Sequence, residues 1–485
     1  MKRLIALVLV LVLVVALVGC GKGNKRQPIQ LTLSTEDAEA ILRAAGIQLP
    51  DIEVAAGANS TVKWYGWGDP FQNYDEDEIV NTGFWTFKQK YNCDIDVVDC
   101  VYGERFDTLA MHLTAGTPPD VMPGGSNSTA IFPMRALRKV VQAADPYINF
   151  DDPLWAPMKD LADLFAIGDK HYQICITTKP SNVVVYNTRV LNEFGYEDPA
   201  ELYYNDEWTW DKFYDMCLDF NDPDMDRYAL DGYAYVGMFM ESTGEQVLMH
   251  DENGYYSNID SPKLERAMQY LYDLKKNDAM YSQSGRGVWT LRGDGVFGSG
   301  MKDGLCLFYV IGESFFTNTV AEISAVWGDI AQNEIMFAPL PRDPQGDGVY
   351  YMASSFEDIK GSMAIIEGAQ NPEGAALLAS CIRFKVIDPI VIQIDERQLK
   401  DTYLWNDDMI AMSKECKKIA DANFIVDLTG DLPDNLQSAM GALGGNGIVR
   451  TSNDTSWGQL KEQYKDQVEF YIEQLNADIA DYITG

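Results

Sequence analysis

The sequence predicts an α/β protein that is built from more than one domain. The chain has 485 residues, of which 46% are hydrophobic and 12% aromatic, enough to pack two or three domains of ordinary size. From Thr61 onward, stretches that alternate like strands are followed by stretches with helical spacing. Strand, helix and strand in that order form a βαβ unit, so we expect largely parallel sheets covered by helices.

The first βαβ unit is predicted directly after Ser60. Residues 61–68 alternate like a strand and end in glycines, and the next segments follow as helix 84–91, strand 94–98, helix 104–113 and a short strand near 119–122. Ligands of open parallel sheets bind beyond the carboxyl ends of the strands. The loops after Tyr65 and after Met122 are therefore the first candidate binding loops.

Later elements keep the α/β alternation. We expect a strand at 183–187, helices at 190–194 and after the N-cap Thr209, a helix at 261–277 with Pro262 first, a strand at 305–311, a helix after the N-cap Asn371, and a C-terminal helix at 459–481. Side-chain oxygens at N-caps and proline at the first helical position are common helix starts.

Charge and metal-ligand content exclude several functions. The formal net charge is −35, with no basic run to offset it, so nucleic-acid binding is disfavoured. The eight cysteines form no C-x-x-C pair and the three histidines are far apart in sequence, so we expect neither a metal nor a cofactor. Cys93 and Cys100 flank a predicted strand that holds them too far apart for a disulfide.

The N-terminus predicts export. Lys2 and Arg3 precede an uncharged stretch of fifteen residues, shorter than a bilayer span needs. The following Leu17-Val18-Gly19-Cys20 resembles the bacterial lipobox. That resemblance implies a signal peptide at 1–19, a diacylated Cys20 and attachment to the outer face of the cell membrane. The alternative is a plain signal peptide or an anchor helix with an incidental cysteine. Residues 20–60 then form a tether with a short helix capped by Ser34 and ended at Gly46.

The order of motifs resembles the extracellular solute-binding proteins of ABC importers, in the family that includes maltose-binding protein. The matching segments are V62-KWYGW, A115-GTPPDVM, I167-GDKHYQI, V185-YNTRVL, W208-TWDKF, F297-GSGM, A338-PLPR and N371-PEGAA. The resemblance implies a two-lobed periplasmic-binding-protein-like fold of type II, with ligand held between lobes that close about a hinge. It places the first lobe at 61–178 and 333–384 and the second at 179–332 and 385–485.

Candidate ligand-binding residues follow the predicted strand ends. In the first lobe these are Trp67 and Asp69 after the first strand and Ser126 and Asn127 after the strand near Met122. Trp67 could instead pack in the core, and Asp69 could cap the next helix. Asp120 is interpreted as a structural carboxylate at a strand start.

The second lobe offers Trp289 in a glycine-rich loop, Glu313 after a buried strand and Phe315 where the family often carries a stacking ring. Their alternatives are a loop anchor, a surface salt bridge and a core position, respectively. Lys179 and Asn182 lie at the crossover, where they could line the site or brace the hinge.

An acidic stretch from Asp222 to Tyr228 carries alternating carboxylates like the first half of a calcium loop. Arg227 stands where glycine is needed and Tyr233 where the bidentate glutamate belongs, so a solvated acidic turn is the preferred interpretation.

The main functional hypothesis is a monomeric, lipid-anchored receptor that delivers a carbohydrate to an ABC permease, without catalytic residues. The alternatives are a secreted glycan-active enzyme that uses a carboxylate pair, a receptor for another polar solute, and a receptor that signals to a sensor.

Overall fold

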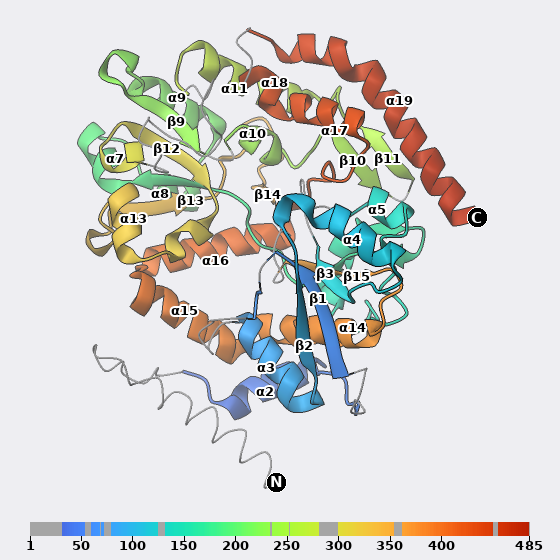
Figure 1. The fold of residues 1–485 in the computed structure, drawn as a ribbon. Coiled ribbons are helices and arrows are strands. Elements are labelled where there is room, and N and C mark those ends of the chain that lie inside the picture. The colour runs from blue at the N-terminus through green and yellow to red at the C-terminus, as the bar shows by residue number, and fades with distance from the viewer. Residues whose placement is uncertain are drawn as a thin grey trace.

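The structure is a computed structural model that describes residues 32–53, 60–67, 69–71, 79–124, 131–232, 235–251, 253–280, 299–353, 361–449 and 454–484. The predictions for Cys20, Ser126, Asn127, Trp289 and Tyr233 lie outside the described residues. Two sheets, each with its own helices, form two lobes (Figure 1). The predicted α/β, two-lobed fold is confirmed.

The first sheet has the strand order β2-β1-β3-β15-β4, with β7 paired to β15. Its strands are β1 (Thr61–Gly66), β2 (Asp94–Asp99), β3 (Val121–Pro123), β4 (Val141–Gln142), β7 (Ile174–Cys175) and β15 (Ser362–Ile366). Strands β1, β2 and β3 are parallel, as the βαβ pattern predicts. Strand β15 runs antiparallel to β3.

Helices of the first lobe cover this sheet. They are α3 (Ile79–Tyr91), α4 (Arg105–Thr114), α5 (Met134–Leu137), α6 (Lys159–Asp163) and α14 (Pro372–Val386), and the short hairpin β5 (Ala166–Ile167) and β6 (Lys170–His171) adds to them. Helix α14 packs along α3. Its start confirms the predicted N-cap, because Asn371 Oδ1 accepts a hydrogen bond from Gly374 N at 2.9 Å.

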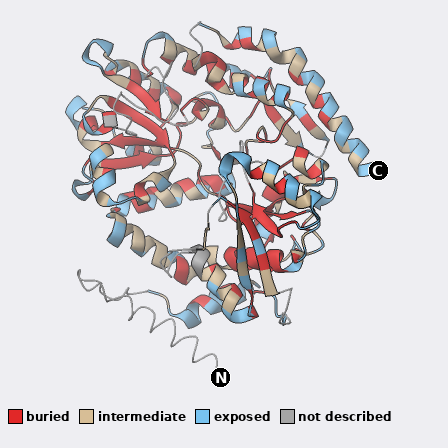
Figure 2. Ribbon diagram, viewed as in Figure 1, coloured by how far each residue is buried: buried red, intermediate tan, exposed pale blue. Residues whose placement is uncertain are grey.

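The second sheet has the order β13-β8-β12-β9. Its strands are β8 (Val183–Asn187), β9 (Tyr228–Gly232), β12 (Cys306–Ile311) and β13 (Ile335–Ala338). Every residue of β8, β12 and β13 is buried (Figure 2). Such continuous apolar runs are typical of strands that are covered on both faces.

Helices and small ribbons complete the second lobe. The helices are α7 (Thr188–Phe194), α8 (Pro199–Tyr204), α9 (Trp210–Phe220), α10 (Met238–Glu241), α11 (Pro262–Lys276), α12 (Ser299–Lys302), α13 (Val320–Val326), α16 (Asp407–Ala422), α17 (Asp434–Gly441), α18 (Gly447–Val449) and α19 (Trp457–Thr484). Strands β10 (Leu248–Asp251) and β11 (Gly254–Ser257) form a hairpin that α19 contacts. Thr209 caps α9, as predicted. Helix α11 begins at Pro262, as predicted, and Ser261 caps it.

One predicted lobe boundary needs correction. The segment 333–384 was expected to return to the first lobe, but β13 pairs with β8 in the second sheet. Only β15 and α14 of this segment join the first lobe. A four-residue apolar run such as Ile-Met-Phe-Ala does not specify which of two buried sheets it joins, because both offer it the same environment.

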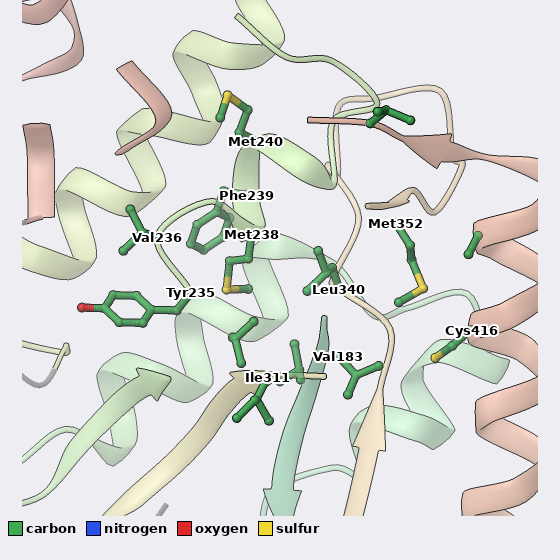
Figure 3. Close-up of a cluster of buried hydrophobic side chains, with 14 of the residues drawn as sticks. Val183, Tyr235, Val236, Met238, Phe239, Met240, Ile311, Leu340, Met352 and Cys416 are labelled. Carbon is green, nitrogen blue, oxygen red and sulfur yellow. The ribbon is translucent and has the colours of Figure 1, made fainter. Parts of the chain in front are cut away.

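The chain passes between the sheets three times. The first crossover is 176–182, between β7 and β8. The second follows β13 and holds β14 (Met352–Ala353), and the third is α15 (Pro389–Tyr403). Ser181 N donates to Ala353 O at 2.9 Å, and β14 pairs with β16 (Phe424–Ile425). Figure 3 shows the apolar cluster beside these crossovers, with Val183, Ile311, Leu340 and Met352 among its labelled members.

The N-terminal helix α2 (Thr35–Ala44) confirms the predicted capped helix. Ser34 caps it through Asp37 N, and Gly46 follows with φ of 72°. The helix docks on the body because Ala38 and Leu42 are buried against it and Thr32 N donates to Gln393 Oε1 of α15 at 2.8 Å. Among the described residues, no helix combines the length and the apolar character needed to cross a membrane.

Candidate functional site

The topology brings one edge of the first sheet, where β1, β3 and β7 end, close to one edge of the second sheet, where β12 ends and β8 begins. Strand β7 is antiparallel to β15, which is antiparallel to β3, so β7 ends at the same edge as β1 and β3. In the second sheet, β8 begins opposite the end of β12, because Val183 is paired with Ile311. The 176–182 crossover joins these two edges and spans no more than about 27 Å when fully extended. The loops at both edges therefore flank the same region.

An aromatic cluster stands at the first-sheet edge. Trp67 directly follows β1 and Tyr102 follows β2, and their side chains are 38% and 45% exposed. The ring centroids lie 5.0 Å apart at an interplanar angle of 89°. In contrast, Trp64 and Tyr65 within β1 are almost fully buried. Two large exposed rings in contact at a strand-end loop are typical of a ligand-binding surface.

Arg105 lies behind these rings at the start of α4. Its guanidinium carbon is 4.3 Å from the Tyr102 ring centroid and 5.8 Å from that of Trp67. The residue is buried, and its Nη1 donates to Tyr102 O. Arg105 O in turn accepts from the Tyr65 hydroxyl. The sequence analysis did not select Tyr102 or Arg105, although the Tyr-Gly-Glu-Arg run after the predicted strand 94–98 was the available signal.

Arg105 is connected through the Phe106 ring to a contact between the lobes. The Arg135 guanidinium carbon of α5 lies 3.4 Å from the Phe106 ring centroid, and Arg135 forms an ion pair with Asp431. Asp431 Oδ2 also accepts from Arg135 N at 2.6 Å. Burial raises the pKa of Asp431 to about 6, although Arg135 acts to lower it. Since Asp431 leads into α17 of the second lobe, this pair ties the two lobes together.

Glu313 stands at the second-sheet edge, directly after β12. Burial raises its pKa to about 7, while a hydrogen bond with Ser413 and the charge of Lys179 act to lower it. Among the described residues, its buried Oε2 has no hydrogen-bond partner. The carboxyl group is thus buried rather than engaged in the surface salt bridge that was the alternative interpretation.

A second buried carboxyl group was missed by the sequence analysis. Glu241 ends α10, and its Oε2 accepts from Asn182 Nδ2 of the first crossover at 3.3 Å. Burial raises its pKa to about 7, and the negative charge of Asp427 raises it further. The sequence around Glu241 is a run of apolar residues without a motif, so only the packing of α10 beside the crossover identifies it.

The remaining predicted residues have structural contacts. Asp69 Oδ1 accepts from Phe71 N at 2.8 Å, which closes an Asx turn after β1. Phe315 is half-buried and packs against the large buried cluster. Asp120 accepts from Lys63 N and Asn371 N, both at 2.8 Å, which confirms its structural role.

The acidic 222–228 segment forms a closed turn. Arg227 Nη2 donates to Asp222 Oδ2 at 3.0 Å, and Asp222 N donates to Arg227 O. In the part of the chain that the structure describes, no group of three or more His, Cys, Asp or Glu residues is arranged to hold a metal ion.

A separate pocket of about 380 Å³ lies within the first lobe beside His171. Its imidazole bridges two carboxylates, with Nδ1 2.6 Å from Asp145 Oδ1 and Nε2 2.8 Å from Asp163 Oδ1. Both ring nitrogens are therefore occupied within the lobe. We place the candidate site at the two sheet edges instead, because the exposed rings and the crossovers meet there.

Comparisons with known proteins agree with this architecture. The family model described as bacterial extracellular solute-binding protein matches residues 84–383. The sugar-binding protein MalE from Xanthomonas citri is similar in structure, with a TM-score of 0.59, 17% identity, and coverage of 85% of this chain and 98% of that one. A cyclo/maltodextrin-binding protein complexed with maltotetraose has a TM-score of 0.55 and 13% identity over 86% of this chain and 99% of its own.

A third similar structure is the galacto-N-biose-/lacto-N-biose I-binding protein of an ABC transporter from Bifidobacterium longum, in complex with lacto-N-biose. Its TM-score is 0.56 at 11% identity, over 87% of this chain and 98% of that one. At such identities the likeness establishes the fold. No curated protein sequence matches the chain.

Proposed function

Since the chain belongs to the bacterial extracellular solute-binding proteins, we propose that it captures a carbohydrate of oligosaccharide size between its lobes and delivers it to an ABC permease. The observation that carries the proposal is the exposed Trp67–Tyr102 pair at the first-sheet edge. Aromatic faces stack on the C–H surfaces of sugars, and sites of this kind combine apolar rings with a few polar groups.

The ligands of the similar structures support this class of solute. Maltotetraose and lacto-N-biose occupy two of them. Lys179 and Asn182 of the first crossover and Glu313 of the second lobe are the proposed polar contacts. Ser126, Asn127 and Trp289 remain proposed contacts outside the described residues.

Ligand capture is proposed to work by closure about the three crossovers. A ligand that touches both lobes stabilises the arrangement in which both sets of contacts form, in proportion to its difference in affinity for the two arrangements. The crossovers are held together by short-range contacts such as Ser181 N to Ala353 O at 2.9 Å. A small rotation there moves the two sheet edges relative to each other.

The receptor is proposed to be held at the outer face of the membrane by lipid on Cys20. The Leu-Val-Gly-Cys run behind a short apolar stretch supports this. Cells that express the full-length chain should retain it in the membrane fraction, whereas Cys20→Ala should abolish metabolic labelling with a fatty acid. Undiminished labelling of Cys20→Ala would refute this anchor.

A ligand screen tests the carbohydrate proposal. The protein without residues 1–19 is heated with a panel of mono- and oligosaccharides, and a ligand that binds only the folded state raises the melting temperature. Hits are then titrated by calorimetry, and the recovered sugar is analysed for cleavage. Saturable binding with intact sugar supports the receptor. A panel without any hit refutes carbohydrate as the ligand, and cleavage products favour the enzyme alternative.

A further inference from the structure

Three contacts around Arg105 define an arrangement that the proposed function does not by itself require. Its guanidinium carbon lies 4.3 Å from the Tyr102 ring centroid, 5.8 Å from that of Trp67 and 4.7 Å from that of Phe106. We propose that Arg105 is the positioning residue of a two-ring platform, formed by Trp67 and Tyr102, that takes the C–H face of a neutral sugar. This inference rests on the proposed carbohydrate function.

The two rings form a corner rather than a flat surface. Their planes meet at 89° with centroids 5.0 Å apart, an edge-to-face contact of ordinary geometry. Both rings are exposed, so one sugar ring can lie against one aromatic face while the other ring borders it. An isolated surface tyrosine or tryptophan samples several rotamers. If both side chains are already held in one rotamer before the ligand binds, less conformational entropy is lost on binding.

Arg105 holds the Trp67 and Tyr102 rings in place from their buried side. Only 6% of the residue is exposed, so its charge faces the rings and not the ligand. A partly desolvated guanidinium over an aromatic face contributes attraction that an ammonium group does not reproduce, because the planar guanidinium also stacks. The Nη1 bond to Tyr102 O and the bond from the Tyr65 hydroxyl to Arg105 O hold both ends of the residue.

This placement also indicates the ligand class. Because Arg105 is covered, the platform presents ring carbons and no free positive charge to its ligand. Acidic and neutral sugars both offer C–H faces to the rings, but the carboxylate of an acidic sugar loses hydration at such a surface without gaining a cationic partner. The platform therefore favours neutral pyranosides over acidic ones.

The platform is connected to the lobe–lobe ion pair through Arg105 and Phe106. Phe106 lies between Arg105 and Arg135, at 4.7 and 3.4 Å from the two guanidinium carbons, and Arg135 pairs with Asp431. The position of the platform rings is thus linked through stacked groups to the second lobe.

The test compares Arg105→Lys and Arg105→Ala with Trp67→Ala and Tyr102→Ala, in the protein without residues 1–19. Trp85→Ala is the matched control, because Trp85 is 41% exposed on α3 and belongs to no part of the platform. Binding of maltotetraose and of the best hit of the neutral-sugar panel is measured by calorimetry. Near-ultraviolet circular dichroism of the ligand-free proteins reports the fixed ring pair, and melting temperature reports folding.

We expect about tenfold weaker binding for Trp67→Ala and Tyr102→Ala, about three- to tenfold weaker binding for both Arg105 variants, and no change for Trp85→Ala. The Arg105 variants should lose part of the near-ultraviolet signal that Trp67→Ala also loses. Wild-type affinity and signal in a folded Arg105→Lys variant would overturn the positioning role.

The outcomes separate this inference from the proposed function. If the wild type binds no neutral sugar, the carbohydrate function and the sugar platform both fail, and the ligand-free spectra still decide whether Arg105 orders the rings. If the wild type binds but neither ring variant weakens binding, the platform fails while the function stands. If Arg105→Ala does not fold, Arg105→Lys decides the same question, because it keeps the positive charge and removes the planar guanidinium.

Discussion

The buried carboxyl group of Glu313 should make the protein less stable at alkaline pH, and Glu313→Gln should remove that effect. The pKa of Glu313 is raised from 4.5 to about 7, mainly by burial. The protonated form is therefore favoured in the folded state. Its contribution to stability is fully present below pH 4.5 and is lost as pH rises through 7.

The magnitude follows from the shift. Raising the pKa of Glu313 from 4.5 to about 7 lowers the free energy of unfolding, relative to the fully protonated protein, by about 3 kcal/mol at pH 8. At pH 5 the same shift lowers it by only about 1 kcal/mol. Glutamine has the shape of the protonated acid and no charge. Among the described residues, the buried Oε2 of Glu313 has no hydrogen-bond partner, so Glu313→Gln breaks no hydrogen bond of that atom there. Glu313→Gln should therefore stabilise the protein by about 3 kcal/mol at pH 8 and by about 1 kcal/mol at pH 5.

Urea unfolding at pH 5 and pH 8, followed by far-ultraviolet circular dichroism, gives both values from the midpoints and slopes. Glu473→Gln is the control, because Glu473 is exposed on α19 and its substitution should change stability by less than about 0.5 kcal/mol at either pH. An equal loss of stability at both pH values in Glu313→Gln would refute the reasoning, since it would mean that a charged, well-paired carboxylate had been removed.

Two further substitutions test contacts that hold the fold and the lobes. Asp120→Ala removes the acceptor of two backbone N–H groups, Lys63 N and Asn371 N, and should lower the free energy of unfolding by about 2–4 kcal/mol. The control Asp96→Ala, at an exposed position of β2, should lower it by less than about 0.5 kcal/mol. Equal losses of the two variants in urea unfolding would contradict the structural role of Asp120. Arg135→Ala leaves the buried Asp431 without its ion-pair partner. Because the pKa of Asp431 is about 6, its carboxyl group is charged at pH 8 and largely neutral at pH 5, so the loss should be about 3 kcal/mol at pH 8 and distinctly smaller at pH 5. Arg43→Ala, at an exposed position of α2 far from the pair in the chain, is the control, and a pH-independent loss in Arg135→Ala would argue against the buried pair.

Local signals predicted most of the elements that frame the site. The run Val183–Asn187 is a strand with the predicted bounds, and Thr209 and Asn371 cap the helices they were expected to cap. These succeed because β-branched runs, cap side chains and N-terminal prolines act within a few residues of themselves. Trp67 was selected for the same reason, as a ring in the loop directly after a strand.

The partners of Trp67 depended on contacts between segments distant in sequence. Tyr102 and Arg105 come from the chain after β2, which the parallel pairing of β1 and β2 brings to the same sheet edge. Glu241 becomes significant only because α10 packs beside Asn182, and the sheet that β13 joins is fixed by its pairing with β8.

The sequence by itself determined the α/β class, the order of the elements and the resemblance that implies two lobes. Only the tertiary structure decided which carboxyl groups are buried, which rings stand exposed together and where Arg135 meets Asp431. The physical reason is that periodicity and capping are short-range, whereas desolvation and ring stacking depend on every segment that surrounds a side chain.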